Sequence, residues 1–232
     1  MEINVHHSAE RAVRSAAPAP TLLTRALLAC GVASGPFFYA VALAQILTRP
    51  GFDIRRDAIS TLSLGDLGWV QVANFAITGV LALACAAGMR SALRGGRGVT
   101  WAPVLVAGYG VALIIGAIFH PDPGLGFPPG APAGMPASMS WHASIHMAAF
   151  AGAFACIVAA CFVLRRRFVS VGLRGWGRYC VATGLVTPVL VVAGSSIKSW
   201  VGVIFAIAGV VGFGWVSAAA ARLRAGIDVG GR

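Results

Sequence analysis

Three histidines and one aspartate form the pattern in this sequence that offers the most chemistry. His142 and His146 are four residues apart, so on a helix their rings share one face, one turn apart. His120 and Asp122 come earlier, at the end of an apolar run. Three imidazoles and a carboxylate can hold Zn²⁺ with a position left for water. The same set can instead shuttle protons, bind a polar headgroup, or hydrogen-bond to backbone carbonyls of the loop that starts at His120.

A second polar segment, residues 51–68, is called the first loop. It contains Arg55, Arg56 and Asp57 in succession. Two adjacent guanidinium groups can bind an anion or a polar headgroup, and local pairing between arginine and aspartate is the alternative. Asp57 also stands where it can cap a short interfacial helix that carries Ile59.

The segment from His120 to His142, called the third loop, holds six of the twelve prolines. Proline lowers the conformational entropy of a loop before it folds. We therefore expect a shaped lid rather than a loose tether, and a rigid spacer between helix ends is the alternative reading.

Six apolar stretches without Asp, Glu, Lys or Arg must position these loops. A helix needs roughly 20 apolar residues to cross a bilayer core of about 30 Å, and in lipid an uninterrupted stretch of that length must be helical. The sequence therefore predicts an all-α, six-helix transmembrane bundle over residues 26–221. It lies between a flexible N-terminal segment, 1–25, and a tail, 222–232. The predicted spans are residues 26–47, 70–89, 101–119, 145–164, 179–197 and 200–221, and only Lys198 and Ser199 separate the last two, which predicts a tight hairpin.

The overall composition agrees with a protein solvated mostly by lipid. Of the 232 residues, 58% are hydrophobic and 11% are charged, whereas an ordinary soluble domain has about 25% charged residues. The mean hydropathy is +0.81. The five cysteines fall within the spans or at their edges, so we expect them to pack as small apolar residues. A soluble, disordered or disulfide-rich protein is excluded.

The positive charges predict the orientation in the membrane. With both termini inside, fourteen of the eighteen Lys and Arg residues lie on the cytoplasmic side, as the positive-inside rule requires. The acidic residues then bring the outer side to zero, so the whole formal charge of +11 lies on one face. We therefore interpret the charge as a topology signal that also attracts anionic lipid headgroups, and not as a nucleic-acid surface. Membrane lipids are the expected partners.

Arginine outnumbers lysine seventeen to one, and alanine, glycine and valine dominate. This composition is typical of GC-rich bacteria, which indicates a bacterial inner (plasma) membrane. Six polar residues lie in or near the outer ends of their spans. They can line a cavity or bond neighbouring helices: Gln45, Gln71, Asn74, Thr78, Ser195 and Ser196.

Several motifs together resemble the bacterial membrane family called domain of unknown function 998. The resemblance covers most of the chain from the first span onward and implies a six-helix protein whose activity is not established. It also implies that the outer loops carry what the family shares. The motifs are Arg55–Gly65, Asp66–Phe75, His120–Gly124, Gly126–Gly130 and Trp141–His146.

A weaker likeness is to the alkaline ceramidase and adiponectin-receptor type of membrane hydrolase, in which a Ser, an Asp and three His surround zinc. Here Ser60 and Asp122 would take catalytic roles, and His120, His142 and His146 would bind the metal. Those hydrolases have seven helices, however, with the paired histidines on the last one, so the likeness is a chemical analogy.

Three functions follow from these patterns. The first is binding of a lipid or small ligand in an outward-facing polar pocket formed by the first and third loops. The second is zinc-dependent hydrolysis of a lipid amide or ester by the residues named above, with a metal-bound water as nucleophile. The third is transport, against which stand the lack of charges within the spans and of a clear inverted repeat. Whether the protein is an enzyme stays open.

Overall fold

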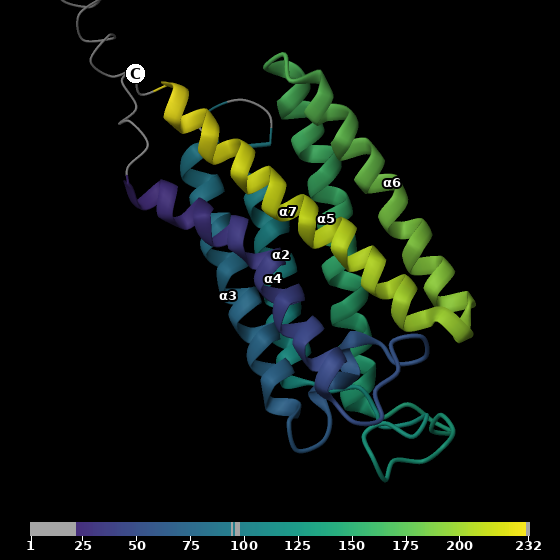
Figure 1. Cartoon of the computed structure of the whole chain (residues 1–232). Coiled ribbons are helices and arrows are strands. Elements are labelled where there is room, and N and C mark those ends of the chain that lie inside the picture. Colours follow the sequence, from purple (N-terminus) through teal and green to yellow (C-terminus); the bar gives the residue numbers. More distant parts are fainter. Residues whose placement is uncertain (1–21, 94, 96–97, 231–232) are drawn as a thin grey trace, which may run out of the picture.

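The computed structural model describes residues 22–93, 95 and 98–230 and is all-helical in that part (Figure 1). Six of the described helices are long and apolar enough to cross a membrane, which confirms the predicted six-helix, all-α fold of a multi-pass membrane protein. They are α2 (Leu22–Thr48), α3 (Gly68–Ala92), α4 (Trp101–Ile118), α5 (Trp141–Ser170), α6 (Arg174–Ser196) and α7 (Val201–Gly230).

Each predicted span overlaps one helix, and several helices run beyond the apolar stretch. α7 continues to Gly230 and thus takes up most of the segment 222–232 that was predicted as a tail. Most of the predicted N-terminal segment, residues 1–25, lies outside the described residues. The backbone of a helix satisfies its own hydrogen bonds, so these extensions are compatible with both lipid and water.

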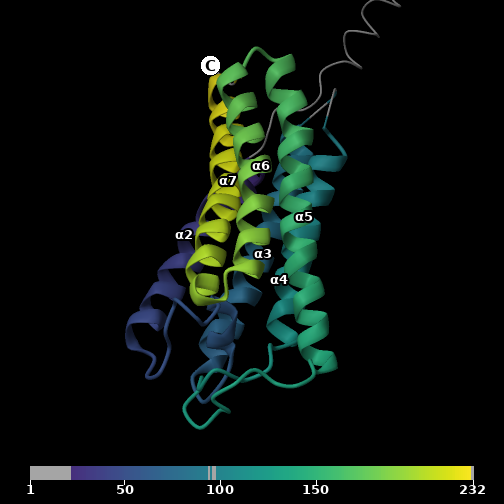
Figure 2. The ribbon, with the colours of Figure 1, turned by 90° about the vertical axis from the view of Figure 1, so that its right-hand side faces the viewer.

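The six helices form a closed ring. Each helix packs against the next one along the chain, and α7 packs against α2 (Figures 1 and 2). The predicted hairpin between the last two spans is confirmed: α6 ends at Ser196, a single 3₁₀ turn, η2 (Lys198–Trp200), follows, and α7 begins at Val201. The core includes an aromatic cluster around Phe213, whose ring lies 5.1 Å from that of Phe38 and 5.0 Å from that of Tyr109.

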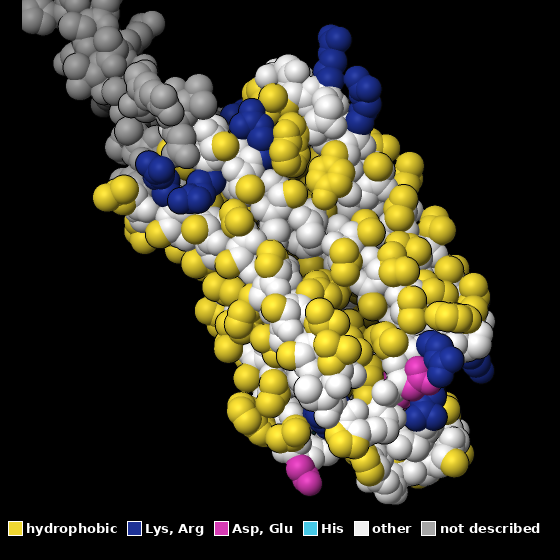
Figure 3. Space-filling view, viewed as in Figure 1, with side chains coloured by type: hydrophobic (Ala, Val, Ile, Leu, Met, Phe, Trp, Pro, Cys, Tyr) yellow, Lys and Arg dark blue, Asp and Glu magenta, His cyan; other side chains and the backbone are white. Residues whose placement is uncertain are grey.

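The bundle has two chemically different ends. At one of them, the terminal end, α2 begins and α7 finishes (Figure 1). At the other, the loop end, the first and third loops lie together beneath the helices (Figures 1 and 2). The space-filling view shows a broad apolar middle between two charged ends (Figure 3), which is the surface that lipid requires.

Candidate functional site

The first loop places Arg55 in a local ion pair. Its guanidinium donates to both carboxylate oxygens of Asp53, with Nε–Oδ1 and Nη2–Oδ2 distances of 3.1 and 2.9 Å. These hydrogen bonds lower the pKa of Asp53 to about 2 and raise the pKa of Arg55. The guanidinium predicted to bind a ligand is therefore already paired within its own loop.

Arg56 and Asp57 are also engaged inside the first loop. Arg56 donates through Nη2 to the carbonyl of Gly51 at 3.0 Å and through Nε to Asp57 at 3.4 Å. Asp57 is only 3% exposed and accepts a 2.8 Å hydrogen bond from the backbone N–H of Asp53. The local-pairing alternative describes these residues better than an open anion site.

A short helix does follow Asp57, but its predicted cap is wrong. The 3₁₀ helix η1 (Ile59–Ser63) begins after Ala58, and no side chain caps it. The Asp57 carboxylate turns back to the preceding turn, where it bonds Asp53, and so cannot reach the N–H groups of η1. The loop is held further by α7, because a Cβ on Gly202 would overlap the carbonyl oxygens of Ile54 and Asp57.

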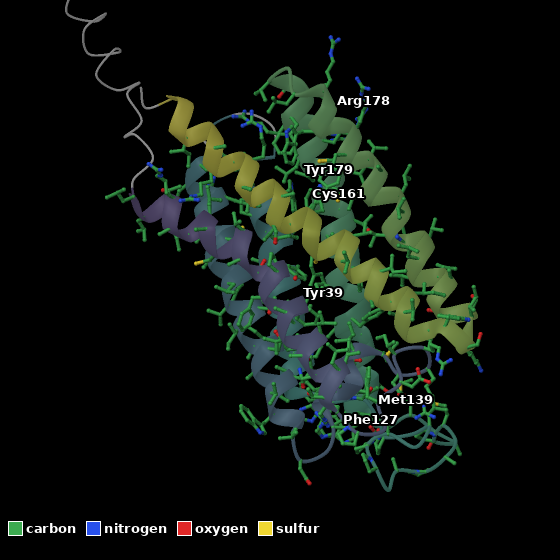
Figure 4. The ribbon with its side chains drawn as sticks, viewed as in Figure 1. Tyr39, Phe127, Met139, Cys161, Arg178 and Tyr179 are labelled. Carbon is green, nitrogen blue, oxygen red and sulfur yellow. The ribbon has the colours of Figure 1, made fainter. Side chains whose placement is uncertain are left out.

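The two loops meet through residues that the sequence did not single out. Arg49, just after α2, donates to the carbonyls of Leu62 and Leu64 at 3.0 and 2.6 Å. Its guanidinium lies 5.4 Å from the ring centroid of Phe127 in the third loop. Phe127 is buried at the loop end (Figure 4) and packs edge-on against Phe52, with ring centroids 5.3 Å apart. The sequence offers one signal for this contact, namely that each of the two polar loops contains a single phenylalanine.

Asp122 of the third loop bonds Ser140, the N-cap of α5. Its Oδ2 accepts a 2.8 Å hydrogen bond from the backbone N–H of Ser140, and the Ser140 hydroxyl accepts one from Ala143 N–H at 3.1 Å. Bonds from Ser140 lower the pKa of Asp122 below its usual value of 3.8. The carboxylate therefore ties the third loop to the N-terminus of α5, where a negative charge is stabilising.

The three histidines lie in three different environments. His146 is 4% exposed, and its Nδ1 lies 2.8 Å from the carbonyl oxygen of Phe119, the C-cap of α4. His142 is exposed, with its ring 3.8 Å from the ring of Trp141 and 5.5 Å from that of Phe119. His120 is half-buried, and no described residue bonds its buried Nε2.

The structure does not gather these histidines into a metal centre. In the part of the chain that it describes, no group of three or more His, Cys, Asp or Glu side chains could hold a metal ion. His146 instead forms a hydrogen bond to a backbone carbonyl, which was one of the alternatives. Its partner is Phe119, one residue before the third loop. No observation on the described residues favours the zinc hydrolase.

A cavity of ≈ 110 Å³ lies inside the ring beside His146. Five helices and the first loop form its wall, which is mostly aromatic and aliphatic. Ser60 and His146 both line it, and Tyr39 lines it from the middle of the bundle (Figure 4). The first loop contributes Ala58 and Ile59 in addition, and the third loop contributes no lining residue. Ser60 and His146 therefore line the same cavity, whereas the other predicted site residues do not line it.

Three of the polar residues of the spans, Gln45, Gln71 and Asn74, form a separate cluster between α2 and α3. Gln45 donates to Gln71 Oε1 at 2.8 Å, and Asn74 donates to the same oxygen at 3.2 Å and to the Phe38 carbonyl at 3.0 Å. These side chains do not line the cavity. Their hydrogen bonds join two neighbouring helices, α2 and α3, and such bonds between helices are favourable in lipid.

Comparison with known proteins adds the family and no activity. Neither a curated protein nor a solved structure matches this chain. A family model does match, over residues 32–222, and this segment contains both loops, the cavity wall and nearly the whole ring. The chain belongs to the family described as Protein of unknown function (DUF998).

Proposed function

We propose that this protein binds a membrane lipid and holds a segment of the lipid's apolar chain in the cavity beside His146. The observation that carries the proposal is the cavity itself, an apolar space inside a membrane bundle with an imidazole and a hydroxyl on its wall. A six-helix membrane protein is surrounded by lipid, so acyl chains are present next to it at high concentration.

The wall chemistry favours an alkyl or isoprenoid chain over a polar solute. Phe150 of α5 and Phe205 of α7 line the cavity with ring centroids 5.0 Å apart, and Phe75 and Phe154 add two more rings. An apolar cavity of about 150 Å³ accepts a benzene-sized molecule. The ≈ 110 Å³ found here suits a short length of chain.

His146 supplies a hydrogen-bond acceptor for the polar part of the same molecule. A carbonyl oxygen can only accept, so the Phe119 carbonyl requires the proton of a neutral His146 to be on Nδ1. Nε2 then keeps its lone pair. A hydroxyl or amide N–H near the head of a lipid can donate to it, and the Ser60 hydroxyl on the same wall can take part.

This proposal refines the predicted outward-facing pocket of the first and third loops. The first loop supplies one side of the cavity, whereas the third loop packs against the first through Phe127. We assign binding to the cavity and support of its wall to Arg49, Arg56 and Asp57, whose bonds hold the first loop in shape.

The test uses a matched pair of substitutions on α5. Ala149 is buried and lines the cavity, whereas its neighbour Ala148 is exposed. The purified protein in detergent is titrated with 1-oleoylglycerol, which has one long chain and free hydroxyls, and binding is followed by native mass spectrometry.

We expect one lipid per chain. Ala149→Phe should weaken binding about tenfold or more, because losing two methylene contacts costs about 1.6 kcal/mol, and Ala148→Phe should leave it within about twofold of the wild-type value. Equal binding by both variants, or no saturable binding by the wild-type protein, would contradict the proposal.

A further inference from the structure

An open surface groove, called the second cavity, lies at the opposite end of the bundle, between α5 and α6. Its volume is ≈ 410 Å³, and three arginines line it: Arg165 from α5, and Arg174 and Arg178 from α6. The rest of its lining is apolar, from Val169, Val181 and Ala182. It therefore combines a cationic rim with an apolar floor.

The packing of the two helices creates this arrangement. Arg174 and Arg178 are one helical turn apart on α6, so they share a face. Gly177 lies between them, and a Cβ there would be 2.6 Å from Val169 Cγ2 and 3.9 Å from the Arg165 carbonyl. Because Gly177 has no side chain, α6 can approach α5 closely and bring Arg165 alongside the other two arginines.

The positive charge of this cavity is not balanced within the described chain. The acid–base pairs between described side chains are those of the first loop, at the other end of the molecule. The first turn of α6 has no acidic residue and its N-cap, Leu173, gives no side-chain cap. Basic side chains near a helix N-terminus are normally unfavourable, so an anion in this place would relieve the repulsion.

We propose that this cavity binds the headgroup of an anionic phospholipid. Arginine forks match phosphate oxygens in geometry and charge. Arg178 lies near the first residue of α6, and the apolar part of the helix begins after Tyr179 (Figure 4). The space-filling view shows dark-blue side chains at the same end of the molecule (Figure 3). Val181 and Ala182 then receive the glycerol and the start of the acyl chains. The cavity is a site for a lipid of the leaflet at the terminal end, separate from the one beside His146.

The test compares two triple variants of equal charge. Arg165→Gln/Arg174→Gln/Arg178→Gln removes the cavity arginines. Arg166→Gln/Arg222→Gln/Arg224→Gln removes three arginines of the same end that do not line the cavity. The full-length protein in neutral detergent is titrated with phosphatidylglycerol, with phosphatidylcholine in a parallel series, and binding is measured by native mass spectrometry.

Wild-type protein should prefer phosphatidylglycerol. The cavity variant should lose at least about a hundredfold in affinity, since each charge-assisted hydrogen bond from arginine to phosphate contributes about tenfold or more, and the control variant should stay within about twofold. A variant that keeps three charges, Arg165→Lys/Arg174→Lys/Arg178→Lys, should bind more tightly than the Gln variant and less tightly than the wild-type protein, because it keeps the charge and loses the fork geometry. Helical circular dichroism checks that each variant is folded.

Equal losses in the two Gln variants would overturn the proposal, because they would show only diffuse attraction to charge. The absence of a preference for phosphatidylglycerol over phosphatidylcholine would overturn it as well. Inorganic phosphate is added as a competitor: failure to displace the lipid supports a lipid site, and displacement at concentrations similar to that of the lipid would assign the cavity to a free anion instead.

Discussion

Single residues in this protein differ in role even where their spacing is regular. His142 and His146 have the spacing that places two rings on one helix face, yet His142 is exposed and His146 is buried. One turn advances a helix by 5.4 Å, which here is enough to pass from the end of the bundle to its interior. The spacing places both rings on one helix face, but it does not tell how deeply each side chain is buried in the bundle.

The two histidines should therefore differ in their effect on stability. His146→Ala should lower the free energy of unfolding by about 1–3 kcal/mol, because it leaves the partly buried Phe119 carbonyl without its partner. His142→Ala should change it by no more than about 0.5 kcal/mol. Thermal unfolding in detergent measures both, and equal effects would show that the hydrogen bond at Phe119 contributes little.

Asp122 should confer a pH dependence on the third loop. Its folded pKa lies below the usual 3.8 because Ser140 bonds the carboxylate, so its contribution to stability is complete above that value and is lost as the pH falls below it. Between about pH 5 and pH 3, the unfolding midpoint of the wild-type protein should fall more than that of Asp122→Asn. Parallel curves for the two proteins would contradict this role.

At the scale of elements, the helices followed from the sequence and the loop contacts did not. Lipid leaves a long apolar segment no alternative to a helix, so six apolar stretches were sufficient to predict α2 to α7. The contact between Arg49 and Phe127 joins residues far apart in the chain, and no local pattern specifies it. The short helix after Asp57 was predicted correctly, whereas the predicted cap by Asp57 was wrong, because the backbone N–H of Asp53 donates to the same carboxylate.

Arg49 is the residue on which the order of the first loop should depend most. Arg49→Met keeps an unbranched side chain but removes two hydrogen bonds to the carbonyls of Leu62 and Leu64, so we expect a loss of about 2–4 kcal/mol in the free energy of unfolding. The loop should also become sensitive to proteases. Arg55→Met is the control, because Arg55 forms an exposed pair and its loss should change stability little. Equal protease sensitivity of the two variants would contradict the assignment.

At the scale of the whole molecule, a ring of six helices separates a strongly basic terminal end from a nearly neutral loop end. We propose that the terminal end faces the cytoplasm, because fourteen of the eighteen basic residues lie on that side. The packing of α7 against α2 closes the ring and determines where the cavity forms. The apolar pattern of a single span does not encode the order of the helices around the ring. The location of the cavity could therefore not be predicted from the sequence.

Two reporter fusions test this orientation. Alkaline phosphatase, which is active only outside the cytoplasm, should be inactive when fused after Arg232 and active when inserted at the exposed Gly130 of the third loop. The reverse pattern would place the terminal end outside and move the cavity beside His146 to the inner leaflet.

Photo-crosslinking in vesicles of phosphatidylcholine that carries a diazirine in one acyl chain tests most directly whether a lipid chain enters the ring. Label is expected on residues that line the cavity, Phe150, Phe154 and Phe205, with at least a severalfold loss of that label in Ala149→Phe but not in Ala148→Phe. Label confined to outward-facing residues of α6 such as Val189 and Val192, and unchanged by Ala149→Phe, would show that no lipid chain enters the ring.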